Sequence, residues 1–276
     1  MIETVSANGC LFSCFTAGPR DGPLALCLHG FPDTPHSWRH LAAELSRDGR
    51  RVVMPFLRGF APTRAPFPGP AGAAVLGDDA NALHAALGAD DRAVLIGHDW
   101  GAAAAYHAVD RQPDRWSSLV ACSWPPVPAD LDVASFDQMR RSWYVFLFQS
   151  PLAAGLVAGG EFLAALWRSW SPGYDPCGEL DHVAAAFAGP DGPEPALAHY
   201  RTLFAPGAPD LPLPRGRVTY VHGADDGCIG ADMIEGLAPC LPPDGAVVVM
   251  PGVGHFPQLE APAGFAAIVR RHLAGG

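Results

Sequence analysis

Short apolar segments alternate along the 276-residue chain with longer segments of helical spacing, and this alternation restricts the fold more than any other feature. The apolar segments are nearly continuous, which is typical of strands that are buried on both faces of a sheet. Strands alternating with helices predict an α/β fold with a mainly parallel sheet and helices on both faces. We expect strands at 24–30, 50–57, 92–97, 117–124, 217–226 and 246–256, and helices at 35–45, 76–89, 100–112 and 264–274.

The alternation is interrupted between residues 125 and 214, where no strand-like segment occurs. This stretch has helical spacing, is rich in tryptophan and tyrosine, and contains segments with many prolines and glycines, which predict loops. Because it is inserted between two expected strands, we expect it to form a helical cap over the C-terminal edge of the sheet. The expected organisation is therefore a core of residues 1–124 and 215–276 with a cap of residues 125–214.

Composition and charge exclude several classes of function. The 18 basic residues are all arginine, so the chain has neither a Schiff-base lysine nor the lysine of a phosphate-binding loop. The net charge of −10 argues against nucleic acid as a partner. The seven cysteines are an odd number without a Cys-x-x-Cys pair, which favours a reduced, cytoplasmic protein. No segment has the apolar length of a membrane span or the pattern of a signal peptide.

Neither a metal site nor a cofactor site is expected. His36 and His40 have a spacing that could bind a metal on a helix, but no third ligand is nearby in the sequence. The glycines at 252 and 254 do not continue into a Gly-x-Gly-x-x-Gly motif, because residue 257 is proline.

An acidic residue stands in a glycine-flanked turn between an expected strand and an alanine-rich expected helix. The turn reads Gly97-His98-Asp99-Trp100-Gly101, the small-x-nucleophile-x-small pattern of a nucleophile elbow. The flanking residues of such a turn are small because strand and helix approach closely, and the N-terminus of the following helix favours an anion. We therefore expect Asp99 to be a nucleophile rather than an ordinary helix N-cap.

A second motif supplies donors for an oxyanion. The segment His29-Gly30-Phe31-Pro32 follows an early expected strand. Its glycine allows a sharp turn that can direct the N–H of Phe31 toward the elbow. Together with the N–H of Trp100, this group would form an oxyanion hole.

Two late segments supply the remaining groups of a catalytic triad. The segment 222–227 offers Asp225 or Asp226 as an acid, and the segment 252–260 offers His255 in a glycine-rich turn after the last expected strand. A nucleophile followed by an acid and then a histidine is the chain order of triads in the α/β-hydrolase fold.

Over nearly its whole length, the chain resembles the epoxide hydrolases of the α/β-hydrolase fold. His29–Pro32 and Gly97–Gly101 match that family's His-Gly-x-Pro and Gly-His-Asp-Trp-Gly motifs, and the peptide before the proline of the first motif is typically cis. The family's Gly-x-x-Asp motif, matched by 223–226, implies Asp226 as the acid. Some relatives place the acid after the strand that ends near Trp124, where this chain offers Asp130.

The resemblance extends to the expected cap and implies the proton donors. The segment 143–151 is similar to the cap segment that carries one ring-opening tyrosine, and it aligns Tyr144. The segment 199–204 is similar to the one that carries the second, and it aligns Tyr200. The other tyrosines that we considered, Tyr106 and Tyr220, lie in the elbow helix and in an expected strand, so we expect them to serve in packing.

The resemblance implies an epoxide hydrolase. Asp99 would attack an epoxide carbon to give a covalent ester, and a water activated by His255 would hydrolyse this ester to release a vicinal diol. The implied partners are a small hydrophobic epoxide and water, in a monomer or homodimer.

Two alternatives stay open. Haloalkane dehalogenases share the aspartate nucleophile and the tryptophan that follows it. However, Phe31 replaces the asparagine that often helps to hold the halide there, so a cap tryptophan would have to supply that donor. A non-catalytic receptor for a small ligand is the other alternative, although it would not need a complete triad. A serine esterase is disfavoured, because no serine occupies the elbow.

Overall fold

The computed structural model describes residues 1–126, 135–207 and 210–275. Its centre is an eight-stranded sheet in the order β1-β2-β4-β3-β5-β6-β7-β8. The strands from β3 onward pair in parallel, whereas β1 pairs with β2, and β2 with β4, in antiparallel orientation. The predicted mainly parallel sheet is therefore confirmed. The strands are β1 (Ile2–Ala7), β2 (Cys10–Ala17), β3 (Leu24–Leu28), β4 (Arg51–Pro55), β5 (Val94–His98), β6 (Ser118–Cys122), β7 (Val218–Gly223) and β8 (Ala246–Met250).

The inner strands owe their apolar sequences to burial on both faces. Every residue of β3, β5, β6 and β7 is buried. The edge strand β8 is partly exposed and is shorter than expected. It ends at Met250 because Pro251 has no N–H for the ladder and Gly252 adopts a positive φ of 70°.

The sequence analysis did not predict the N-terminal hairpin of β1 and β2. Its two-residue turn is Asn8-Gly9, in which both residues have positive φ, 45° and 73°. This backbone suits the right-handed twist of a hairpin, and Asn-Gly is a common sequence for it. The hairpin extends the sheet beyond β4, at the edge away from the later strands.

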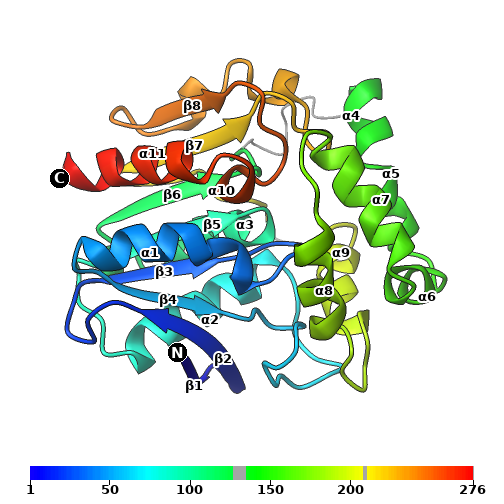
Figure 1. Ribbon diagram of the computed structural model, residues 1–276, viewed down its shortest axis with the longest axis horizontal. Helices are drawn as coiled ribbons and strands as arrows, with labels where there is room; N and C mark the ends of the chain where they lie inside the picture. The colour runs from blue at the N-terminus through cyan, green and yellow to red at the C-terminus, as the bar shows by residue number, and fades with distance from the viewer. Residues whose placement is uncertain (127–134, 208–209, 276) are drawn as a thin grey trace.

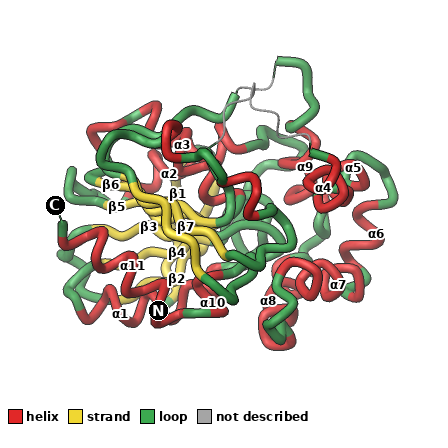
Figure 2. Tube along the Cα trace, turned by 90° about the horizontal axis from the view of Figure 1, so that it is seen from above, coloured by secondary structure: helices red, strands yellow, loops and turns green. Residues whose placement is uncertain are grey.

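Helices cover both faces of the sheet. Helices α1 (Arg39–Arg47) and α11 (Pro262–Ala274) lie on one face, and α2 (Ala73–Ala86) and α3 (Trp100–Arg111) lie on the other (Figure 2). Two separate apolar clusters, one on each face, form the core. The expected helix at 35–45 is divided into a 3-10 turn, Pro35–Trp38, and the α-helix that follows it.

The segment between β6 and β7 is helical in its described part, as predicted. Its helices are α4 (Phe136–Arg141), α5 (Trp143–Leu147), α6 (Ala153–Ala158), α7 (Glu161–Trp170), α8 (Cys177–Ala186) and α9 (Glu194–Thr202). They gather at one end of the sheet (Figure 1), and we refer to α4–α9 as the lid. None of the helices in the described ranges is long and apolar enough to cross a membrane.

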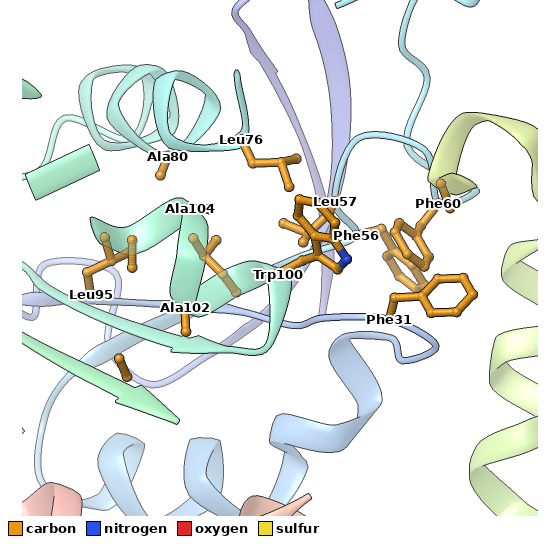
Figure 3. Packing of buried hydrophobic residues seen from close by; sticks show 14 of the residues in the cluster. Phe31, Phe56, Leu57, Phe60, Leu76, Ala80, Leu95, Trp100, Ala102 and Ala104 are labelled. Carbon is orange, nitrogen blue, oxygen red and sulfur yellow. The ribbon is translucent and has the colours of Figure 1, made fainter. Parts of the chain in front are cut away.

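The larger apolar cluster joins the lid to the sheet. Phe31, in the loop after β3, and Phe60, in the loop after β4, extend toward the lid in Figure 3. Both rings contact Phe187 at the end of α8, with ring centroids 6.0 and 5.4 Å apart. The lid therefore closes over the loops that carry the candidate site.

Candidate active site

The turn between β5 and α3 holds Asp99 in a conformation that residues other than glycine rarely adopt. Its φ of 51° and ψ of −120° lie in a sparsely populated region. The neighbouring glycines allow this turn: a Cβ on Gly97 would overlap the backbone of Gly101, and a Cβ on Gly101 would overlap the carbonyl oxygen of Leu28. Small residues at both positions therefore let β3, β5 and α3 approach closely.

The Asp99 carboxylate is buried and hydrogen-bonded. Phe31 donates its backbone N–H to Oδ1 at 2.8 Å, and a Cβ on Gly30 would overlap this carboxylate. Burial raises the pKa of Asp99 to about 6, although His255 and the backbone N–H groups of Phe31 and Trp100 act in the opposite direction. The two expected oxyanion donors, the N–H groups of Phe31 and Trp100, thus already face the Asp99 carboxylate.

His255 lies between two carboxylates. Its Nδ1 is 2.9 Å from Oδ2 of Asp226, and its Nε2 is 3.8 Å from Oδ2 of Asp99. With Nδ1–H donated to Asp226, Nε2 is left unprotonated on the side of Asp99. Burial disfavours the charged imidazole, but the charges of Asp226 and Asp99 outweigh burial and raise the pKa of His255. This is the arrangement of a general base with an orienting acid.

Asp226 is fixed by its own loop, which we call the acid loop (residues 224–230). Its Oδ1 accepts the N–H groups of Cys228 and Ile229 at 2.7 and 3.0 Å, which leaves Oδ2 for the imidazole. The adjacent Asp225 is exposed. Asp130, the other acid that the sequence offered, lies outside the described residues. The hydrogen bond to His255 is thus made by Asp226.

Sequence reasoning missed the side chains that hold the backbone around His255. Glu260 accepts the N–H groups of Gly254 and Phe256 at 2.7 and 3.0 Å, and the hydroxyl of Ser171 at 2.6 Å. The carbonyl oxygen of His255 accepts the hydroxyl of Ser123 at 2.8 Å. It also lies 2.9 Å from Nε2 of His98, so the expected motif residue His98 contacts the histidine loop (residues 251–256).

His29 and Pro32 of the early motif shape the loop after β3. Leu57 donates its N–H to Nε2 of His29 at 3.1 Å, and Nδ1 of His29 lies 2.8 Å from the carbonyl oxygen of Gly30. Burial lowers the pKa of His29 to about 3, so this ring is neutral. The Phe31–Pro32 peptide is cis, as the resemblance implied.

The two lid tyrosines enter the site from α5 and α9. Tyr144 and Tyr200 are buried, with ring centroids 5.9 Å apart. Burial raises the pKa of both phenols well above the usual value, and the charge of Asp99 raises it further. Both phenols are therefore protonated and can donate. The ring of Tyr200 packs edge-on against Phe31 and Trp100, with centroid distances of 5.1 Å in each case.

The lid also holds the loops that carry Asp226 and His255. Gln138 of α4 exchanges two hydrogen bonds of 3.0 and 2.9 Å with the backbone of the acid loop. The carbonyl oxygen of Trp170, at the end of α7, accepts one N–H from the acid loop and one from the histidine loop at 3.0 and 3.1 Å. No motif in the sequence indicated these contacts, because they join segments far apart in the chain.

Within the described residues, one group has the donor atoms and spacing to hold a metal ion: Asp226, Cys228 and His255, whose ligand atoms lie within 4.8 Å of one another. These residues include the acid and the histidine described above. His36, considered from the sequence, instead stacks on His182 with a centroid distance of 3.6 Å.

Comparison with known proteins agrees with this geometry. Residues 23–262 match the family described as alpha/beta hydrolase fold. Epoxide hydrolase 2 of Siraitia grosvenorii is 33% identical over 202 residues, which are 71% of this chain and 62% of that protein. Epoxide hydrolase A of Mycobacterium tuberculosis is 32% identical over 209 residues, 70% of this chain and 62% of that protein. The chain thus spans less than two thirds of the length of these curated relatives.

Solved structures resemble the whole chain. Epoxide hydrolase VrEH1 from Vigna radiata superimposes with a TM-score of 0.82 at 28% identity, covering 100% of this chain and 98% of that one. Epoxide Hydrolase A from Mycobacterium thermoresistibile superimposes with a TM-score of 0.84 at 26% identity, with the same coverage.

Proposed function

The chain belongs to the α/β-hydrolase fold family, and we propose that it is an epoxide hydrolase that converts a small hydrophobic epoxide and water into a vicinal diol. The observation that carries this proposal is a buried carboxylate at the elbow, Asp99, that lies 3.8 Å from the imidazole of His255, together with two buried lid phenols, one of which packs against Phe31 and Trp100. A carboxylate at the elbow is suited to displacement at a saturated carbon, whereas a serine there would attack a carbonyl.

In the first step, an Asp99 oxygen attacks one epoxide carbon from behind and the carbon–oxygen bond of the ring breaks. The leaving oxygen takes a proton from Tyr144 or Tyr200, which hydrogen-bond it as negative charge develops. The products of this step are a hydroxyalkyl ester of Asp99 and a phenolate. Because the site is buried, the phenol hydrogen bonds are stronger than they would be in water.

In the second step, Nε2 of His255 takes a proton from a water molecule, whose oxygen attacks the carbonyl carbon of the ester. The N–H groups of Phe31 and Trp100 would hold the resulting oxyanion. Collapse of the intermediate expels the alkoxide, which takes the second proton of the attacking water, so that the diol is released and the Asp99 carboxylate is regenerated. The proton on His255 returns to the phenolate, so the net reaction consumes one epoxide and one water.

We propose residues 125–214 as the cap domain and residues 1–124 and 215–276 as the hydrolase core. The cap contributes both phenols and, with Phe148 and Trp170, much of the aromatic wall around them. The ring of Phe148 lies 4.8 Å from that of Tyr200, and the ring of Trp170 lies 4.9 Å from that of Tyr144. These surroundings favour a hydrophobic epoxide.

A halide leaving group is the second candidate, because the indole N–H of Trp100 is buried without a hydrogen-bond partner among the described residues. An unpartnered buried donor near the nucleophile could hold a chloride or bromide ion. Assays with haloalkanes that measure halide release, run in parallel with the epoxide assays, separate this activity from diol formation.

The test uses His255→Gln beside wild type. Wild type should convert a panel of styrene-oxide-like, aliphatic and glycidyl epoxides to diols. With an epoxide that is turned over, the variant should accumulate the ester, seen by intact-protein mass spectrometry as enzyme plus substrate and located on Asp99 by peptide mapping. The Asp99→Asn variant is the matched control and should gain no mass. A His255→Gln protein that also gains no mass contradicts the two-step scheme.

A further inference from the structure

Cys228 contacts both Asp226, the proposed triad acid, and Tyr144, a proposed proton donor. Its backbone N–H donates to Oδ1 of Asp226 at 2.7 Å, and its Sγ lies 3.2 Å from the hydroxyl oxygen of Tyr144. The side chain is almost fully buried, with 1% of the residue exposed. One residue therefore joins the triad acid to a phenol of the lid.

The two phenols consequently differ. The hydroxyl of Tyr144 has the thiol as a partner, whereas among the described residues that of Tyr200 lies near the indole N–H of Trp100 but lacks the geometry of a full hydrogen bond. Other contacts hold both partners of the Tyr144–Cys228 contact in place. The ring of Tyr144 packs against Trp170 and Phe148, with centroid distances of 4.9 and 5.5 Å. The carbonyl oxygen of Cys228 accepts a 3.0 Å hydrogen bond from Gln138.

A thiol is chemically suited to this position. Sulfur is a weak hydrogen-bond acceptor, so it can orient the phenol hydrogen before the reaction and release it readily to an epoxide oxygen. After proton transfer, the S–H can turn and donate to the buried phenolate, which would otherwise have no solvent. The thiol stays protonated throughout, because burial and the charge of Asp226 raise its pKa well above the usual value.

We propose that Cys228 is a positioning residue for Tyr144, and that the hydrogen bond between them makes Tyr144 the principal proton donor to the epoxide oxygen, with Tyr200 as the second contact. This inference rests on the proposed function. It predicts that the thiol assists formation of the Asp99 ester and does not affect the rate of its hydrolysis, since the phenolate takes its proton back only after the ester bond has been cleaved.

The experiment compares Cys228→Ala, Cys228→Ser and wild type under single-turnover conditions, with ester formation and ester decay followed by rapid quench and intact-protein mass spectrometry. Alanine keeps the backbone N–H to Asp226 and removes only the thiol. We expect it to slow ester formation about tenfold, the loss of roughly one hydrogen bond. Ester decay should be unchanged, and serine should restore ester formation to within about threefold of wild type.

Two further variants exclude a packing effect. Cys27→Ala removes an equally buried thiol from β3, on the opposite face of the sheet, and should leave both steps unchanged. In a Tyr144→Phe background, Cys228→Ala should have no further effect, because the phenol through which it acts is absent.

The inference is overturned if alanine slows both steps equally, if serine is as slow as alanine, or if the effect persists without the Tyr144 hydroxyl. A wild-type protein that forms neither ester nor diol would instead overturn the proposed function. A wild-type enzyme that is active, with Cys228→Ala equally fast, refutes only the role of the thiol.

Discussion

Replacing Asp99 by asparagine should stabilise the fold while abolishing turnover. Burial raises the pKa of the carboxyl from 3.8 to about 6, so its ionised form is less favourable in the folded than in the unfolded chain. Each pKa unit corresponds to about 1.4 kcal/mol, and the difference therefore destabilises the wild type by about 3 kcal/mol above pH 6. Asparagine removes this penalty and keeps an oxygen that can accept the N–H of Phe31.

The sign of the effect follows from proton binding. Between about pH 4 and pH 6 the folded protein holds a proton on Asp99 that the unfolded chain has lost, so stability falls as the pH rises through this range. The increase in the free energy of unfolding caused by Asp99→Asn should therefore be near zero at about pH 4 and reach about 3 kcal/mol at about pH 8.

Urea unfolding at a series of pH values, followed by circular dichroism, measures this difference. The matched control is Asp225→Asn, which removes an exposed carboxylate from the acid loop and should change the unfolding free energy little at any pH. The reasoning fails if Asp99→Asn is no more stable than wild type at about pH 8. It also fails if the gain is the same at about pH 4, since titration could then not be its cause.

Three further substitutions test contacts in the site and elsewhere in the core. Glu260→Gln should lower the free energy of unfolding by about 2 kcal/mol, measured by calorimetry, because an amide nitrogen would face a backbone N–H. Since the affected backbone carries His255, single-turnover kinetics should show ester hydrolysis slowed more than ester formation. Gly101→Ala should abolish soluble folded protein, since its Cβ would overlap a carbonyl oxygen of β3, whereas Gly178→Ala, which meets no atom within 4 Å, should be tolerated in the same solubility assay. Arg58→Met should lower the unfolding free energy by about 3–5 kcal/mol in urea titrations, because it leaves the buried carboxylate of Asp79 without the ion pair that now binds both its oxygens. A loss below about 1 kcal/mol would contradict this.

The parallel strands and the covering helices could be predicted because burial on two faces leaves a continuous apolar run, which is a local signal. The N-terminal hairpin was missed because its strands alternate between more buried and more exposed positions, so neither has the continuous burial of the inner strands. The turn Asn8-Gly9 between them was the available signal. The last two strands end earlier than predicted, because the chain leaves the sheet after Gly223 and after Met250 to form the loops that carry Asp226 and His255.

The expected site residues were found through motifs, each of which is contiguous in sequence. The structure brings Asp99, His255 and Asp226 together. The supporting contacts had no such signal. Ser171 and Glu260, which meet beside His255, are 89 residues apart in the chain, and only the fold determines that they lie side by side.

The hydrogen bonds that join the lid to the acid and histidine loops limit how this protein could be recombined with its relatives. A chimaera that exchanges only α4–α9 with the lid of a relative would separate Gln138 and the Trp170 carbonyl from the loops they bind, so the imidazole would lose its alignment together with the old pocket. A functional exchange of the lid should therefore also exchange the loops that it binds, so that the segments 224–230 and 251–260 come from the same relative as the new lid.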